Sequence, residues 1–236
     1  MSFMDASTGR IVANAAESER AAFIKRTYLH LGGAIAAYAV VVSLFIASGI
    51  ANAFMGVLAG SSWMWLLVMG AYMGISMLAD NWAHSGVSRE RQYMGLGLYI
   101  VAFGFLSTIP IARALMMDSS ILMHAAGITA ALVGGLTFTA FSTKINFSFM
   151  GRFLMIGGFV AMGIIVAGII FGFSLGLWFM GAMIIFAAAS VLYSTSNIIH
   201  EYHTDQHVAA SLSLFSSVGL LFWYVIQFLM AFASGD

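Results

Sequence analysis

The residues with the clearest chemical potential lie in one short run of histidines and acids. His200, His203 and His207 are spaced three and four residues apart, so a helix would place the three imidazoles on one face. Imidazoles arranged in this way could hold a metal, with Glu201 and Asp205 as further ligands. The run is not the H-E-x-x-H zinc motif, because the first two histidines stand too close together. We favour the alternative, a solvated loop, and predict neither a metal nor another cofactor.

A second pattern, Gly172-Phe173-Ser174-Leu175-Gly176, matches the G-x-S-x-G motif of serine hydrolases. That motif requires a strand, a sharp turn and a helix, with acid and histidine partners further along the chain. Here it lies between two long apolar runs, which predict helices on both sides. The sequence also has no phosphate loop and no dinucleotide fingerprint. We therefore predict a protein that is not an enzyme and has no catalytic residue.

The elements that position these residues are membrane spans, as the composition indicates. Hydrophobic residues make up 61% of the chain, charged residues only 8%, and the mean hydropathy is +0.98. A soluble domain carries about 25% charged residues, so this chain cannot cover a water-facing surface and must lie largely in a lipid bilayer. Nine basic and nine acidic residues cancel, and no basic arm suggests a nucleic-acid partner.

Apolar runs of about the length of a membrane helix occur seven times. They predict an all-α fold, a polytopic membrane protein with a seven-transmembrane-helix bundle. We expect Pro110 to end the third span, because proline cannot continue the helical hydrogen bonds. A cytoplasmic N-terminal segment, residues 1–27, precedes the transmembrane domain, residues 28–236. The predicted spans are Tyr28–Ile50, Ser62–Ala79, Gln92–Ile109, Ile121–Phe141, Phe149–Phe171, Leu175–Tyr193 and Val208–Phe232.

The basic residues predict the orientation of these spans. Eight of them fall on one side of the membrane: Arg10, Arg20, Lys25, Arg26, Arg89, Arg91, Lys144 and Arg152. Arg113 alone falls on the other side. The positive-inside rule then places the N-terminus in the cytoplasm, or its equivalent, and Asp236 outside. A bacterial inner membrane fits best, with the mitochondrial inner membrane and the endoplasmic reticulum as alternatives. Residues 15–26 are predicted to form a short juxtamembrane helix.

The interiors of the predicted spans lack Asp, Glu, Lys and Arg. Because charges inside the membrane mark ion paths and proton relays, this argues against a pump or an ion-coupled transporter. Asp80 is expected at the membrane interface, and Gln227 is expected to bond to a neighbouring helix. Glycines spaced by four, such as Gly70 and Gly74, are expected at helix contacts within the bundle rather than in a homodimer.

Several segments resemble the Bax inhibitor family, and their order and spacing together are specific. They are residues 23–31, Ala125-x-x-x-Thr129-Ala130, FTAFSTK at 138–144, FSFMG at 147–151, YSTSNII at 193–199 and AASLSLF at 209–215. The resemblance covers about residues 20–232. It implies seven spans with a cytoplasmic N-terminus and a cytoprotective membrane protein. Some members leak calcium in a pH-sensitive way, and a bacterial member modulates a membrane-bound AAA protease.

The family's pH response is attributed to two aspartates, and this chain departs from the pattern at both places. Ser194 follows Tyr193 where the first aspartate is expected, and Ser217 replaces the second. Two carboxylates can share a proton and titrate near neutral pH, whereas serine hydroxyls cannot. The resemblance therefore implies that the pH-gated leak is lost or replaced. Contact between the two serines is expected only if the last helix begins early, inside the preceding loop.

Two functions follow from this sequence. The first is a non-enzymatic scaffold or modulator bound to another membrane protein complex. The alternative is a cation (calcium) leak channel that works without the aspartate pair. Such a channel would need a polar path, for which the candidates are Ser194, Ser213, Ser217 and Gln227.

Overall fold

The computed structural model describes residues 9–59, 62–84, 88–143 and 145–235. Its helices are α1 (Glu17–Ala47), α2 (Ile50–Ala59), α3 (Ser62–Ala83), α4 (Arg89–Met117), α5 (Ser119–Ser142), α6 (Met150–Phe171), α7 (Gly176–His200) and α8 (His207–Ser234), with short 3-10 turns at Val12–Asn14 and Phe147–Phe149. Seven of these helices, all but α2, are long and apolar enough to cross a membrane. The predicted all-α seven-helix bundle is confirmed.

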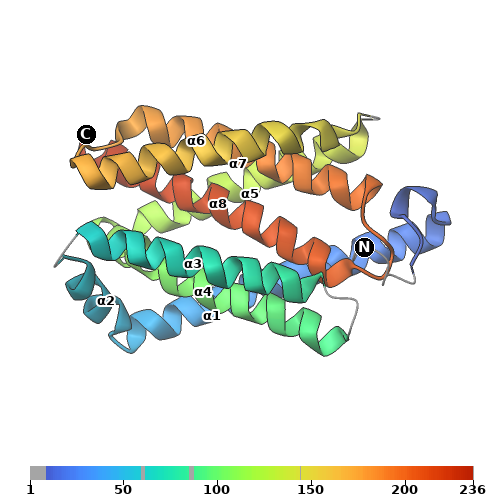
Figure 1. Cartoon of the computed structure of the whole chain (residues 1–236), viewed down its shortest axis with the longest axis horizontal. Helices are drawn as coiled ribbons and strands as arrows, with labels where there is room; N and C mark the ends of the chain where they lie inside the picture. Colours follow the sequence, from blue (N-terminus) through green and yellow to red (C-terminus); the bar gives the residue numbers. More distant parts are fainter. Residues whose placement is uncertain (1–8, 60–61, 85–87, 144, 236) are drawn as a thin grey trace.

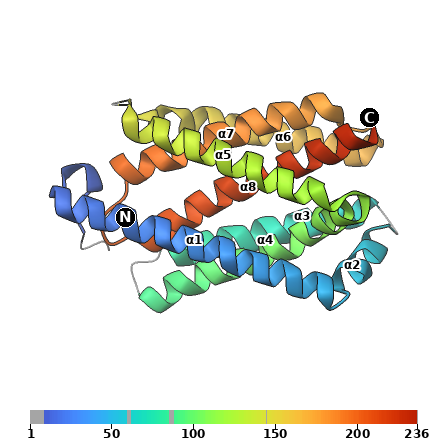
Figure 2. The ribbon, with the colours of Figure 1, turned by 180° about the vertical axis from the view of Figure 1, so that it is seen from behind.

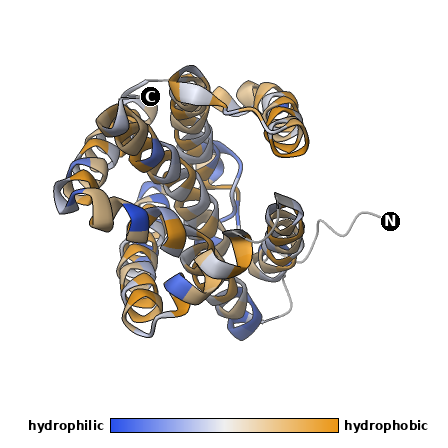
Figure 3. Ribbon diagram, turned by 90° about the vertical axis from the view of Figure 1, so that its left-hand side faces the viewer, coloured by the Kyte–Doolittle hydropathy of each residue, from blue (hydrophilic) through white to orange (hydrophobic). Residues whose placement is uncertain are grey.

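The outer surface of the bundle is apolar. Trp178 is 94% exposed, and Met116 and Phe171 are each 78% exposed. Viewed along the bundle, hydrophobic residues lie on helices all round its periphery (Figure 3). Because such a surface would be unfavourable in water, it must face lipid. The chain is an integral membrane protein.

Helix α8 forms the centre of the bundle. It contacts α1, α3, α4, α5 and α7, and both side views show it running between the other helices (Figures 1 and 2). Leu214, Leu221 and Ile226 on this helix are fully buried. Residues on α8 therefore meet side chains from most of the fold, which makes this helix the natural place for a site.

Pro110 does not end the third span, and that prediction is wrong. Helix α4 continues through this buried proline to Met117. In a bilayer no water is present to satisfy free backbone groups, so the apolar stretch after the proline gains more from staying helical than from breaking. The hydroxyls of Ser107 and Thr108, just before the proline, donate to the carbonyls of Phe103 and Gly104.

Helix α2 was not expected from the sequence. Gly49 has φ +77°, a left-handed conformation that suits glycine and redirects the chain after α1. The ten residues of α2 are too few to span a bilayer. Phe54 and Leu58 pack on Ile109 of α4, so α2 covers one end of the bundle.

The N-terminal part of the described chain is attached to the loop between α7 and α8. The Val12 amide donates to the Tyr202 carbonyl at 2.9 Å, and the Thr204 amide donates to the Arg10 carbonyl at 3.0 Å. The predicted juxtamembrane helix is not separate, because α1 runs unbroken from Glu17 into the first span. The division at residues 27 and 28 thus falls inside a helix. The predictions for Lys144 and Asp236 lie outside the described residues.

The described basic residues support a direct test of orientation. The starts of α1, α4 and α6 lie at one end of the bundle (Figure 1), whereas Arg113 is near the end of α4. The chain has no cysteine, so single cysteines can be labelled without background. In bacterial cells, we expect a membrane-impermeant maleimide to label Ser174→Cys from outside and Glu90→Cys only after permeabilisation. The reverse pattern would invert the topology.

Candidate functional site

Four serine hydroxyls meet between α7 and α8. The hydroxyl oxygens of Ser194 and Ser217 lie 2.8 Å apart, and both side chains are buried. Ser190 adds a contact of 3.0 Å to Ser217, and the Ser213 hydroxyl donates to Ser194 at 3.3 Å. We call these four residues the serine cluster. Since a hydroxyl both donates and accepts, the cluster satisfies itself without any charge.

The contact between Ser194 and Ser217 arises for a different reason from the one expected. Helix α8 begins at His207, only one residue before the predicted start, so it does not begin early in the loop. Instead α7 continues for seven residues beyond Tyr193, to His200. This extension places Ser194 well inside the antiparallel pair of helices, level with Ser217.

Ser190 is a member of the cluster that sequence reasoning missed. It precedes Ser194 by four residues, so the two lie one turn apart on the same face of α7. The same spacing relates Ser213 to Ser217 on α8. A search for paired serines at helical spacing would have found all four members.

A cavity of about 580 Å³ lies beside the serine cluster. Ser190, Ser217 and Gln227 contribute polar groups to a wall that is otherwise mostly apolar and aromatic. The structure therefore brings Ser194, Ser213 and Ser217 together and places Gln227 along the neighbouring cavity. Within the described part of the chain, Gln227 makes none of the expected hydrogen bonds to another helix.

A second, smaller cavity of about 390 Å³ has a charged group at its wall. Its lining includes Asp80 of α3 and His84, which directly follows α3. Ser213 of the serine cluster lines it as well. Tyr99 and Ser216 line both cavities, so the two are adjacent. Polar groups therefore run from the serine cluster to Asp80, which was expected only to lie at the membrane interface.

The titratable groups around this second cavity have pKa values that differ from their ordinary ones. His84 Nδ1 lies 3.2 Å from an Asp80 carboxylate oxygen. Desolvation would lower the pKa of His84, but the hydrogen bonds and charge of Asp80 outweigh it and raise the pKa above its ordinary value. Burial raises the pKa of Tyr202 in the adjoining loop to about 12, so this hydroxyl stays neutral at physiological pH.

The three histidines of the opening motif do not share a helical face. His200 ends α7, His203 lies in the loop, and His207 begins α8. The premise of a continuous helix is wrong because Ile11 pairs with His203 in an antiparallel bridge, which requires an extended backbone there. No group of three or more histidines and acids in the described residues is arranged to hold a metal.

The imidazoles instead bond to different partners. His200 Nδ1 donates to the Ser196 carbonyl at 2.9 Å, and His203 Nδ1 lies 3.4 Å from the side-chain oxygen of Gln206. The ring of His207 lies beside that of His30, with centroids 4.9 Å apart. The G-x-S-x-G pattern likewise lacks its required context, because Ser174 lies in a turn between two helices.

Comparisons with known proteins agree with this architecture. A family model described as "Inhibitor of apoptosis-promoting Bax1" matches residues 20–234. Bax inhibitor 1 of Schizosaccharomyces pombe is 24% identical over 235 residues, covering 95% of this chain and 82% of the yeast protein. An uncharacterised protein of Pseudomonas aeruginosa is 31% identical over 118 residues, covering 50% of this chain and 52% of the relative.

An uncharacterised protein of Neisseria meningitidis serogroup A is 26% identical over 113 residues, covering 48% of this chain and 49% of the relative. The matches to the Pseudomonas and Neisseria relatives thus span about half the length of those proteins. No solved structure matches the chain.

Proposed function

The chain belongs to the Bax inhibitor family, and from this premise we propose that it is a non-enzymatic membrane protein that modulates another membrane protein complex. It acts as a scaffold within the bilayer, with its N-terminus in the cytoplasm. A bacterial inner membrane is the setting we propose. Its partner is another membrane protein, bound through the lipid-facing helices.

The serine cluster is the observation that carries this proposal. A pH-gated leak needs a group at the bundle centre that gains or loses charge between the closed and open states. Ser194 and Ser217 occupy the positions where the family resemblance implies the aspartates, and their hydroxyls bond to each other. Hydroxyls remain neutral across the physiological range, so no proton decides whether α7 and α8 attract or repel. A protein without that switch can still act through its contacts.

A cation leak remains the second candidate, and one observation favours it. Asp80 is an acid beside a polar cavity that adjoins the cavity reaching Gln227. A carboxylate at the entrance to a polar path attracts cations. Such a path would run past Ser213 and Ser216 without involving the missing aspartate pair.

Calcium flux distinguishes the two functions. We expect the purified protein in liposomes to show negligible calcium flux that does not change from acid to neutral pH. In mild detergent, the protein extracted from its own membrane should migrate as a larger assembly than the purified chain. Substantial flux that is lost in Asp80→Asn, and kept in the nearby Asn81→Ala control, would instead establish the leak channel.

A further inference from the structure

A groove opens between α1 and α4 near the basic end of the bundle. It has a volume of about 380 Å³ and is lined by Leu29, His30, Gly33, Ala34, Tyr93, Leu96, Gly97 and Ile100. Ala34, Leu96 and Ile100 form a buried floor, whereas Leu29 and Tyr93 on the rim are 64% and 45% exposed. The groove is therefore apolar at its base and accessible from the membrane.

Glycine on each wall keeps this groove open. A Cβ atom built at Gly33 on α1, or at Gly97 on α4, would meet no heavy atom within 4 Å. The contrast with Gly95 on the same helix is clear, since a Cβ there would lie 2.5 Å from the Ala79 carbonyl oxygen. The space beside Gly97 is thus not used for packing by the described part of the chain.

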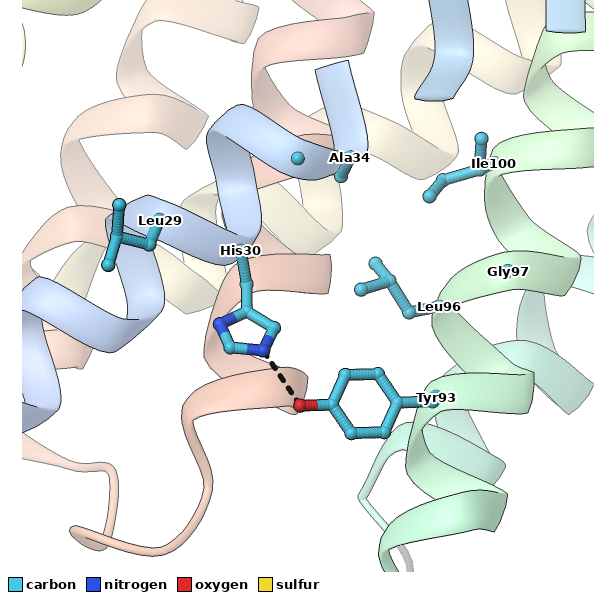
Figure 4. A pocket seen from close by; sticks show the side chains of 8 residues that line it. Leu29, His30, Ala34, Tyr93, Leu96, Gly97 and Ile100 are labelled. Carbon is cyan, nitrogen blue, oxygen red and sulfur yellow. Dashed lines mark hydrogen bonds between the residues drawn. The ribbon is translucent and has the colours of Figure 1, made fainter. Parts of the chain in front are cut away.

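The mouth of the groove carries polar and basic groups. His30 reaches from α1 toward α4, where its Nε2 lies 2.8 Å from the Tyr93 hydroxyl (Figure 4). The Arg26 carbonyl accepts from His30 Nδ1 at 2.7 Å, so Nδ1 carries a proton. His207 packs on His30, and Arg89 Nη1 lies 3.2 Å from His207 Nε2.

The two arginines near the mouth of the groove have no anionic partner among the described residues. Among the described residues, His84 and Asp80 form an ion pair whose nitrogen and oxygen lie within 4.0 Å. No described carboxylate lies within that distance of a side-chain nitrogen of Arg26 or Arg89. Both arginine side chains are exposed. The Arg89 guanidinium lies beside the His207 imidazole, and Arg26 lies one turn before His30 on α1. Together with the Tyr93 hydroxyl, these groups form an arrangement that favours a phosphate group.

We propose that this groove binds one anionic phospholipid. Its phosphate lies at the mouth, near Arg26, His30 and Arg89, and one acyl chain lies on the apolar floor beside Gly33 and Gly97. The occupant follows from the combination of charge and setting: basic pockets between transmembrane helices bind anionic lipid head groups at the membrane surface. A soluble anion would gain nothing from the apolar floor, and a neutral lipid would gain little from the arginines.

Native mass spectrometry of the purified protein tests this with phosphatidylglycerol and phosphatidylcholine as probes. We expect one phosphatidylglycerol to be retained per chain in preference to phosphatidylcholine. Gly97→Phe should abolish this binding by filling the groove, as should Gly33→Phe from the opposite wall. Removing charge with Arg26→Gln and Arg89→Gln should weaken binding about fivefold for each arginine, or about twenty-five-fold together.

Matched controls separate the groove from general effects on the membrane surface. Gly70→Phe places the same side chain on α3, where a Cβ also meets no neighbour, and Arg152→Gln removes an exposed charge from α6. Both should retain the lipid. Equal binding of phosphatidylcholine, or unchanged binding in both phenylalanine variants, would overturn the proposal. So would a dimer that Gly97→Phe dissociates, because a second copy would then fill the groove.

Discussion

Replacing Ser194 and Ser217 together by aspartate is expected to make the stability of the bundle depend strongly on pH. The two side chains are buried and their oxygens lie 2.8 Å apart. Two buried carboxyls at these neighbouring positions would not both ionise, so burial and like charge raise the pKa of at least one above its ordinary value of about 3.9. The folded variant then binds a proton more tightly than the unfolded chain does.

The sign of the effect follows from this raised pKa. The contribution to stability is fully present below the unfolded pKa and is lost as the pH rises toward the folded value. Over that window, the free energy of unfolding falls by about 1.4 kcal/mol for each pH unit. Thermal unfolding in detergent from pH 4 to pH 8 measures it. The double aspartate variant should also gain a pH-dependent calcium flux in liposomes.

The native protein and an asparagine variant provide the controls. The pKa of His84 is also raised in the folded protein. The native protein itself therefore loses some stability as the pH rises through the pKa of the folded state. Subtracting the native pH dependence from that of the variant removes this background. Ser194→Asn with Ser217→Asn adds similar volume without a titratable group. If the asparagine variant has the same slope as the aspartate variant, the shared-proton argument is wrong.

Substitution of Gly95 by alanine is expected to destabilise the packing of α3 on α4. The added Cβ would lie 2.5 Å from the Ala79 carbonyl oxygen and 2.7 Å from the Ala83 amide nitrogen. Both are backbone atoms, which cannot move aside as a flexible side chain could, so the helices must separate. Overpacking of this kind costs about 1–3 kcal/mol, which unfolding in mixed micelles would measure.

Gly97→Ala is the matched control for this prediction. It makes the same chemical change two residues further along α4, where the added Cβ meets nothing within 4 Å. Its effect on the free energy of unfolding should lie within about 0.5 kcal/mol. If both variants lose the same free energy of unfolding, the loss arises within helix α4 and not from its contact with α3.

The sequence alone was sufficient for the membrane environment, the number of spans and the family. Each rests on a property that is local along the chain. A bilayer core requires every backbone group to be bonded within its own segment, so a long uncharged apolar run must be a helix regardless of its neighbours. The family resemblance likewise depended on short ordered segments, and the match over residues 20–234 confirms it.

Only the tertiary structure decided where the helices end and which faces meet. Pro110 reads locally as a stop, yet α4 continues past it because the surrounding bundle leaves no water to bond a broken backbone. His200, His203 and His207 read locally as one helical face, yet pairing of Ile11 with the loop disperses them. In both cases the surroundings of the segment overrode its local pattern.

The glycines and serines illustrate the same limit. Gly70 and Gly74 have the spacing of a helix contact, but a Cβ at either meets no neighbour, whereas Gly95 lies against the backbone of α3. Ser190 joins Ser217 only because the packing of α7 on α8 sets the register of the two helices. Hydropathy identifies a helix but does not fix its rotation or its depth relative to a partner. Those two quantities determine every contact in the candidate site, and they are set when the helices pack.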